Sequence, residues 1–84
     1  MRAALGADDA GPLTDALLDD LARRGYEVAR HGALADGSSA WASIGRAVAR
    51  EVVEGRADFG IVCCWTGTGI SIAANKVPGA RAAL

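Results

Sequence analysis

The sequence predicts an α/β domain with a Rossmann-like, three-layer α/β/α fold built around a parallel sheet. Two observations lead to this prediction. Short apolar segments alternate along the chain with stripes of apolar residues at helical spacing, and the connections between them are short. Such alternation produces parallel strands that are joined by right-handed crossovers. Eighty-four residues allow one domain with a modest core.

The first third of the chain contains two predicted strands and one helix. Residues 2–6 form a short apolar strand, and Pro12 suits the first position of the helix that follows. The predicted buried stripe of this helix consists of Leu13, Leu17, Leu18 and Leu21. Gly25 is a favourable C-terminal cap, and residues 26–30 alternate as a second strand.

The remainder of the chain adds two helices and two strands. Ser39 is the predicted N-cap of a second helix, which Gly55 ends. Its predicted buried face comprises Trp41, Ile44, Val48 and Val52. Residues 59–64 are continuously apolar, as expected of a strand that is buried on both faces. Residues 70–76 form a short third helix, and residues 81–84 open a fourth strand.

The predicted strand order is 2-1-3-4 in sequence numbering. A chain that ends on a strand leaves an unpaired sheet edge unless something adds to it. We therefore expect residues 1–84 to be a single domain that is truncated within or just after its fourth strand.

Composition and charge narrow the class of protein. The net charge of −1 and the pI near 5.6 give no reason to expect nucleic acid or an anionic membrane as a partner. The chain has no apolar run of about 20 residues and no signal-peptide pattern, so a cytoplasmic protein is expected. Cys63 and Cys64 are adjacent, which disfavours a disulfide framework, and with His31 as the only histidine no metal-ligand spacing is present. Free thiols fit a reducing compartment.

The strongest candidate site is the point where residues 59–64 give way to Thr66-Gly67-Thr68-Gly69 and then to a helix. Glycines let the backbone amides of such a turn converge, and the helix N-terminus favours negative charge there. A thiol in that field loses its proton more easily than a free cysteine, so Cys64 is the predicted chemical residue and Cys63 a buried strand residue. The loop lacks the further residues of a dinucleotide fingerprint or a P-loop, and a simple tight turn is the alternative.

Four other residues bear on the site. Asp8 and Asp9 follow the first strand, and ligands of doubly wound sheets bind at the carboxyl ends of strands. If the first and third strands are neighbours, this loop faces the Cys64 loop; a solvated acidic turn is the equal alternative. His31 is expected to be a loop residue away from the site, and Trp41 is expected in the core.

Three stretches carry a resemblance to a known family. They are residues 4–11, residues 25–28 and, above all, Cys64-x-Thr-Gly-x-Gly-x-Ser-Ile-Ala-Ala-Asn-Lys-Val-Pro-Gly-x-Arg81. Together they resemble the N-terminal half of the ribose-5-phosphate isomerase B / galactose-6-phosphate isomerase family. The resemblance implies a five-stranded parallel sheet, a homodimer or higher oligomer, and aldose–ketose isomerisation of a sugar or sugar phosphate without metal or cofactor.

The resemblance also implies residue roles. Cys64 corresponds to the base that moves a proton between C1 and C2 of the open-chain sugar through an enediolate, and Asp8 corresponds to an aspartate that contacts the sugar. The residues that would hold the enediolate oxygens or shape the pocket are Trp65, Thr66, Gly67, Thr68, Gly69 and Ser71. The ring-opening and phosphate-binding residues of the family belong to its C-terminal half.

Two departures from the family pattern favour a different sugar. Asp9 stands where the family usually has a phosphate-binding histidine, and its negative charge repels a phosphate. Trp65 stands where the family commonly has glycine. An isomerase is the leading hypothesis. The alternatives are a non-catalytic anion-binding, sugar-binding or interaction remnant of the family, and a cysteine phosphocarrier or thiol-redox domain.

Overall fold

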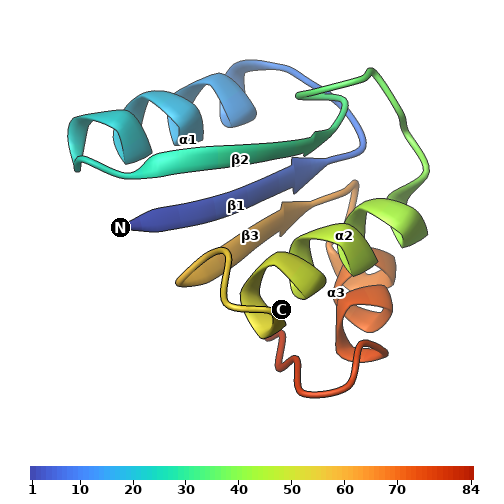
Figure 1. The fold of residues 1–84 in the computed structure, drawn as a ribbon. Helices are drawn as coiled ribbons and strands as arrows, with labels where there is room; N and C mark the ends of the chain where they lie inside the picture. Colours follow the sequence, from blue (N-terminus) through green and yellow to red (C-terminus); the bar gives the residue numbers. More distant parts are fainter.

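The computed structural model describes all 84 residues as a three-stranded sheet with helices on both faces (Figure 1). In chain order the elements are β1 (Arg2–Ala7), α1 (Pro12–Arg23), β2 (Glu27–Gly32), α2 (Trp41–Val53), β3 (Phe59–Cys63) and α3 (Thr68–Asn75). The strands are parallel in the order β2-β1-β3. Helix α1 covers one face, and α2 and α3 lie on the other, which confirms the predicted three-layer fold. None of the helices has the length and apolar character needed to cross a membrane.

Helix α1 forms largely as predicted. It begins at Pro12 and is followed by Gly25, whose φ of +84° is the left-handed conformation that glycine adopts readily. Leu21 is buried, with Leu17 and Leu18 packed beside it. Leu13 is 65% exposed instead, because its place in the first turn carries it past the end of the sheet to the rim of a surface pocket. The stripe therefore has three core members and not four.

Helix α2 corrects two predictions. Its N-cap residue is Ala40 without a side-chain cap, so the prediction of Ser39 as the cap was wrong. Ile44 and Val48 are buried as predicted, but Trp41 is 47% exposed because it begins the helix, beyond the sheet. A Cβ atom built on Gly69 would lie 3.1 Å from the Trp41 ring, so this ring covers the first turn of α3 and not the sheet.

The core is divided by the sheet. On the α1 side Ala3 and Leu5 of β1 pack with Leu21, and on the α2 side Ala4 packs with Val48 and Ala57. Helix α2 approaches the sheet closely where β1 carries Gly6, since a Cβ atom there would lie 2.6 Å from Ile44 Cγ2. A third cluster joins α2 to α3 and the segment after it; its buried members are Ala49, Ala74 and Val77.

The strand register brings the ends of β1 and β3 together. Ala7 is the partner of Cys63 on β3 and of Gly32 on β2, so all three strands end at the same level. The Asp8 amide continues the β1–β3 ladder by donating to the Cys63 carbonyl at 3.2 Å. The loops that follow β1 and β3 therefore leave the sheet side by side.

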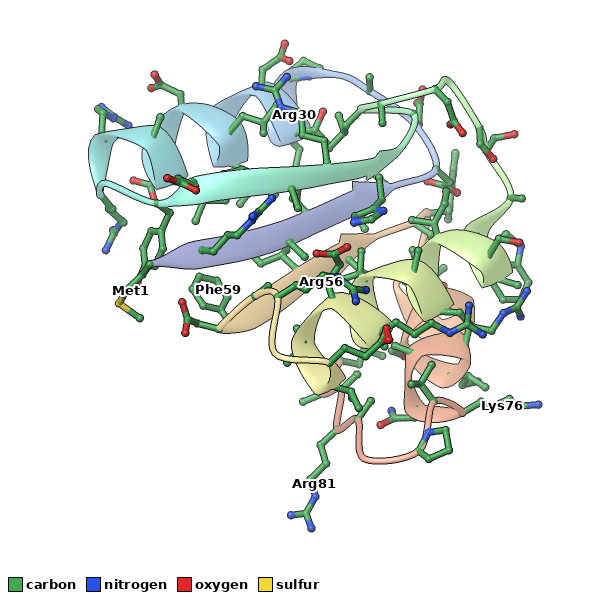
Figure 2. All side chains as sticks on the ribbon, viewed as in Figure 1. Met1, Arg30, Arg56, Phe59, Lys76 and Arg81 are labelled. Atoms are coloured by element: carbon green, nitrogen blue, oxygen red, sulfur yellow. The ribbon has the colours of Figure 1, made fainter.

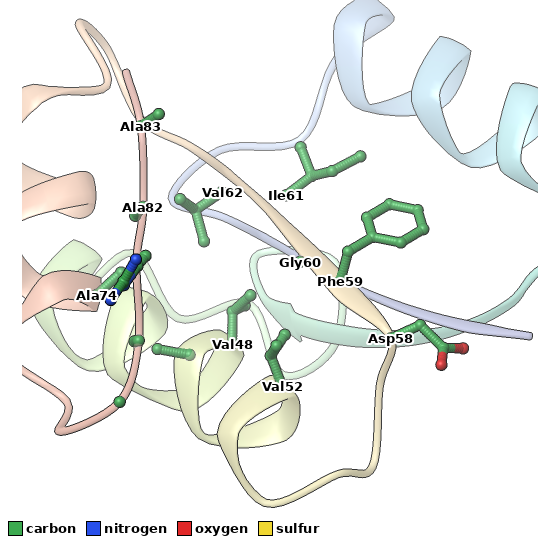
Figure 3. Close-up of a pocket in the computed structure, with 14 residues that line it drawn as sticks. Val48, Val52, Asp58, Phe59, Gly60, Ile61, Val62, Ala74, Ala82 and Ala83 are labelled. Atoms are coloured by element: carbon green, nitrogen blue, oxygen red, sulfur yellow. The ribbon is translucent and has the colours of Figure 1, made fainter.

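The predicted fourth strand is absent, since residues 80–84 have no strand structure. Ala82 is bonded to a side chain instead of a strand: its amide donates to Asn75 Oδ1 at 2.8 Å, and its carbonyl accepts from Asn75 Nδ2 at 2.9 Å. A cavity of about 490 Å³ separates this segment from β3, with Val48 and Val52 of α2 also in its wall (Figure 3). We call this space the edge cavity.

Candidate active site

The predicted juxtaposition of two loops is present at the carboxyl end of the sheet. A pocket of about 300 Å³ lies between residues 8–14, which are the loop after β1 and the first turn of α1, and Cys63, Cys64 and Trp65. We call it the thiol pocket. Four of the predicted site residues line it: Asp8, Asp9, Cys64 and Trp65.

Both cysteines are free and both line the thiol pocket. Neighbouring residues within a strand point to opposite faces of the sheet. Strand β3 ends at Cys63, so Cys64 belongs to the following turn, and the two side chains can face the same pocket. Burial, the negative charge of Asp8 and the presence of Cys64 raise the pKa of the Cys63 thiol. Cys63 therefore holds its proton at neutral pH more firmly than a free cysteine does.

The Thr-Gly-Thr-Gly loop forms the N-terminus of α3. Gly67 is the N-cap residue, with a left-handed φ of +81° that β-carbon-bearing residues rarely adopt. The Thr68 amide donates to Thr66 Oγ1 at 3.2 Å, and the Ser71 hydroxyl donates to the Thr68 carbonyl at 2.9 Å. These two predicted donors are therefore already used inside the loop.

Other amides of this loop are unpaired. The backbone N–H groups of Trp65, Thr66, Gly67 and Gly69 donate no hydrogen bond. Consecutive free amides at a helix N-terminus suit a negatively charged oxygen. However, the structure places Thr66, Gly67, Thr68, Gly69 and Ser71 outside the lining of the thiol pocket, next to it along the chain.

Two residues that the sequence reading left out of the site cover this loop. Trp41 lies over Gly69, and a Cβ atom built on Gly67 would lie 2.6 Å from Leu84 Cδ1. Trp41 was missed because its spacing with Ile44 is that of a core stripe. Leu84 gave no signal at all, because nothing in a local pattern connects it to a loop 17 residues earlier.

Carboxylates dominate the charge of the thiol pocket. Its lining contains Asp8 and Asp9 and no lysine, arginine or histidine. The N-terminus of α1 contributes about half a positive charge, which is much less than two carboxylates. Lys76 and Arg81 extend away from the body at the far end of α3 (Figure 2). The pocket is therefore net negative.

Comparison with known protein families identifies the family of this chain. The family model described as Ribose/Galactose Isomerase matches residues 3–84, nearly the whole chain. The chain belongs to the ribose/galactose isomerase family.

Individual members of the ribose/galactose isomerase family match over almost all of the chain. Ribose-5-phosphate isomerase B of Mycobacterium tuberculosis is 42% identical over an alignment of 86 residues, which covers 100% of this chain and 53% of the relative. The structure of ribose-5-phosphate isomerase B from Clostridium thermocellum matches with a TM-score of 0.88 at 48% identity, covering 99% of this chain and 57% of the other. For the enzyme from Trypanosoma brucei the TM-score is 0.81 at 39% identity, with 98% and 57% covered. The chain thus spans about half the length of the relatives it matches.

His31 lies away from the site, as predicted, but it belongs to β2 and not to a loop. Its Nε2 atom is buried without a hydrogen-bond partner, 3.8 Å from Glu51 Oε1 of α2. Alternation along β2 turns it toward α2 and away from the thiol pocket. The structure contains no cluster of three or more histidine, cysteine or acidic side chains that could hold a metal ion.

Proposed function

We propose that this chain carries the proton-transfer site of an aldose–ketose isomerase that acts on a sugar or a sugar phosphate. Membership of the ribose/galactose isomerase family supports the reaction class. The observation that carries the proposal is the position of Cys64. It follows β3 directly, lines a pocket with Asp8, and precedes a run of unpaired amides.

The proposed step is the transfer of a proton between two carbons of an open-chain sugar. The Cys64 thiolate takes the proton from C2 of the aldose, and the electrons of the broken C–H bond move toward C1 and its carbonyl oxygen. In the resulting enediolate the hydroxyl proton of O2 passes to O1. Cys64 then returns the carbon-bound proton to C1, and the carbonyl group lies at C2 of the ketose. Free amides near the developing charge stabilise it most effectively when they are already in place, and the amides of Trp65, Thr66, Gly67 and Gly69 are candidates for this role.

The surroundings of the two thiols support Cys64 as the base. A base must lose its proton near the working pH, and the raised pKa of Cys63 makes that residue the poorer choice. Cys64 lies beyond the end of the strand, in the turn that leads to the α3 N-terminus. Asp8 is proposed to accept a hydrogen bond from a sugar hydroxyl, because its loop faces Cys64 across the thiol pocket.

One observation favours the second candidate, a non-catalytic sugar-binding member of the family. The thiol pocket holds neither a histidine nor any other basic side chain that could open a sugar ring or hold a phosphate. Turnover of a ring-form aldose by these 84 residues is therefore expected to be close to the uncatalysed rate. With an open-chain substrate no ring has to be opened, so an assay then measures only whether the chain transfers the proton.

The test uses ketoses that cannot close a five-membered ring, namely erythrulose and ribulose 5-phosphate. Formation of the aldose by the purified chain is followed by NMR, with Cys64→Ala and Cys63→Ala as a matched pair. Slow conversion that disappears in Cys64→Ala and persists in Cys63→Ala is the expected result. Conversion that is equal in all three proteins and in buffer would favour the sugar-binding alternative.

A further inference from the structure

Trp65 is the most exposed large apolar side chain of the molecule. It is 98% exposed, although it lines the thiol pocket. A fully exposed indole contributes nothing to the core, and large exposed aromatic groups commonly mark binding sites. Leu13, 65% exposed, lies on the rim of the same pocket from α1. The pocket therefore has an apolar rim supplied by two different elements.

The interior of the thiol pocket has the opposite character. Asp8 and Asp9 bring carboxylates, Cys64 brings a thiol, and no basic side chain is present. Asp9 Oδ1 accepts the Ala10 amide at 3.0 Å, which holds this carboxylate to its own loop. Carboxylates accept hydrogen bonds from hydroxyl groups and repel a phosphate, and the half charge of the α1 N-terminus is too small to reverse this.

A sugar matches both surfaces, because hydroxyl groups cover part of it and C–H groups the rest. We propose that Trp65 is a positioning residue: its indole ring packs against the C–H face of the sugar chain while the hydroxyls point to Asp8 and Asp9. The thiol pocket then holds the uncharged, hydroxylated part of the ligand, and any phosphate lies outside it. This inference rests on the proposed function, from which it takes a sugar as the ligand.

The size of the thiol pocket agrees with a small ligand. Its volume of about 300 Å³ is at the lower end of the range for small-molecule sites. A tetrose or a pentose is small enough for such a space. The inferred ligand is therefore a short sugar, with or without a terminal phosphate.

Binding of erythrulose, ribulose and ribulose 5-phosphate to the 84-residue chain tests the inference. Saturation-transfer NMR gives the affinities and shows which sugar protons contact the protein. Trp65→Ala is expected to weaken each of the three sugars by roughly two- to tenfold, whereas Trp65→Phe keeps most of the affinity. Val53→Ala, at an exposed apolar position at the end of α2 and outside the pocket lining, is the control and leaves the affinity unchanged. Free ribulose and ribulose 5-phosphate are expected to bind with similar affinity.

Equal affinities of the unchanged chain and Trp65→Ala would overturn the inference, as would the absence of binding by all three sugars. At least roughly tenfold tighter binding of ribulose 5-phosphate than of ribulose would overturn the placement of the phosphate outside the pocket. In the conversion assay, Trp65→Ala should raise the KM and leave kcat almost unchanged. If Cys64→Ala loses conversion but Trp65→Ala changes neither binding nor KM, the role of Trp65 is wrong and the proposed function stands. If Trp65→Ala weakens binding but Cys64→Ala still converts the sugar at the normal rate, the proposed function is wrong and the role of Trp65 stands.

Discussion

At the scale of single residues, the two neighbouring thiols differ because one ends β3 and the other starts a turn. The prediction that this strand is buried on both faces was wrong: β3 is only half-buried, because no further strand pairs with its outer edge. The pKa of Cys63 is raised mainly by burial and then by the charge of Asp8. Cys64 shares the thiol pocket but follows the last residue of β3. The end of β3 between Cys63 and Cys64 therefore gives the two neighbouring thiols different surroundings.

Alkylation rates should separate the two thiols. In Cys63→Ser the remaining Cys64 should be the faster of the two thiols to react with iodoacetamide at neutral pH, because the thiolate is the reacting form and burial disfavours it at Cys63. In Cys64→Ser the remaining Cys63 should react slowly until the pH rises above the range of a free cysteine, since its folded-state pKa is raised. Faster labelling of Cys63, or identical pH profiles, would contradict the assignment.

Asp9 should discriminate against phosphate. Asp9→His removes a negative charge from the thiol pocket and adds a hydrogen-bond donor. We expect the ratio of affinities for ribulose 5-phosphate and ribulose to rise by several-fold, on the order of 1 kcal/mol, with a larger effect below the histidine pKa. NMR titration of both sugars measures this ratio. Asp15→His, in the first turn of α1 but outside the pocket lining, is the control. An unchanged ratio in Asp9→His would show that the negative charge of Asp9 is not what keeps a phosphate out of the thiol pocket.

At the scale of elements, the Asn75 side chain takes the part that a neighbouring strand was expected to play for residues 81–84. It bonds both backbone groups of Ala82 and also donates to the Ser71 carbonyl at 3.1 Å. The segment after α3 is held to that helix, and the edge cavity stays open beside β3. The Asn75 amide thus fixes the backbone of Ala82, in addition to the packing of Ala80 and Ala82 against the cluster of Ala49, Ala74 and Val77.

Removal of this amide should release the C-terminal segment. In Asn75→Ala two hydrogen bonds to Ala82 are lost, each contributing about 1 kcal/mol. Trypsin should then cleave after the exposed Arg81 roughly tenfold faster, because cleavage needs a locally opened chain. Mass spectrometry of the released peptide gives the rate, and Ile72→Ala on the exposed side of α3 is the control. If Asn75→Ala and Ile72→Ala are cleaved alike, the side chain does not hold the segment.

The elements also show what could be predicted from sequence. Hydrophobic periodicity and short connections predicted the parallel sheet. Because neighbouring parallel strands end at the same edge, the sheet in turn predicted that Asp8 and Cys64 lie on adjacent loops. Local patterns failed where the partner is distant. The spacing of Trp41 could not reveal that the sheet ends before it, and the apolar run at residues 81–84 could not reveal that Asn75 would bind Ala82.

At the scale of the whole molecule, a three-stranded sheet leaves both outer strands as edges. Beside β3 the edge cavity is lined mainly by apolar residues of α2, β3 and the segment after α3. Open edges next to apolar surface favour association between chains. The chain also spans about half the length of its relatives, which include M. tuberculosis ribose-5-phosphate isomerase B with 53% covered.

Association should couple the stability of the fold to protein concentration. A folded state that binds a second copy gains stability by mass action, so the Tm should rise as the concentration rises. Calorimetry over about a hundredfold range of concentration, together with sedimentation velocity at the same concentrations, measures both quantities. A constant Tm with a monomer at every concentration would show that the open edges are tolerated.

The central role proposed for Cys64 is the removal of a proton from a sugar carbon. Deuterium wash-in from D₂O at C1 of erythrulose, measured by NMR, reports this step without ring opening or complete turnover. We expect exchange above the buffer rate in the unchanged chain and in Cys63→Ala, and a fall by up to about a hundredfold in Cys64→Ala, the size of effect typical of a general base. Exchange at the same rate in Cys64→Ala as in the unchanged chain would contradict the account.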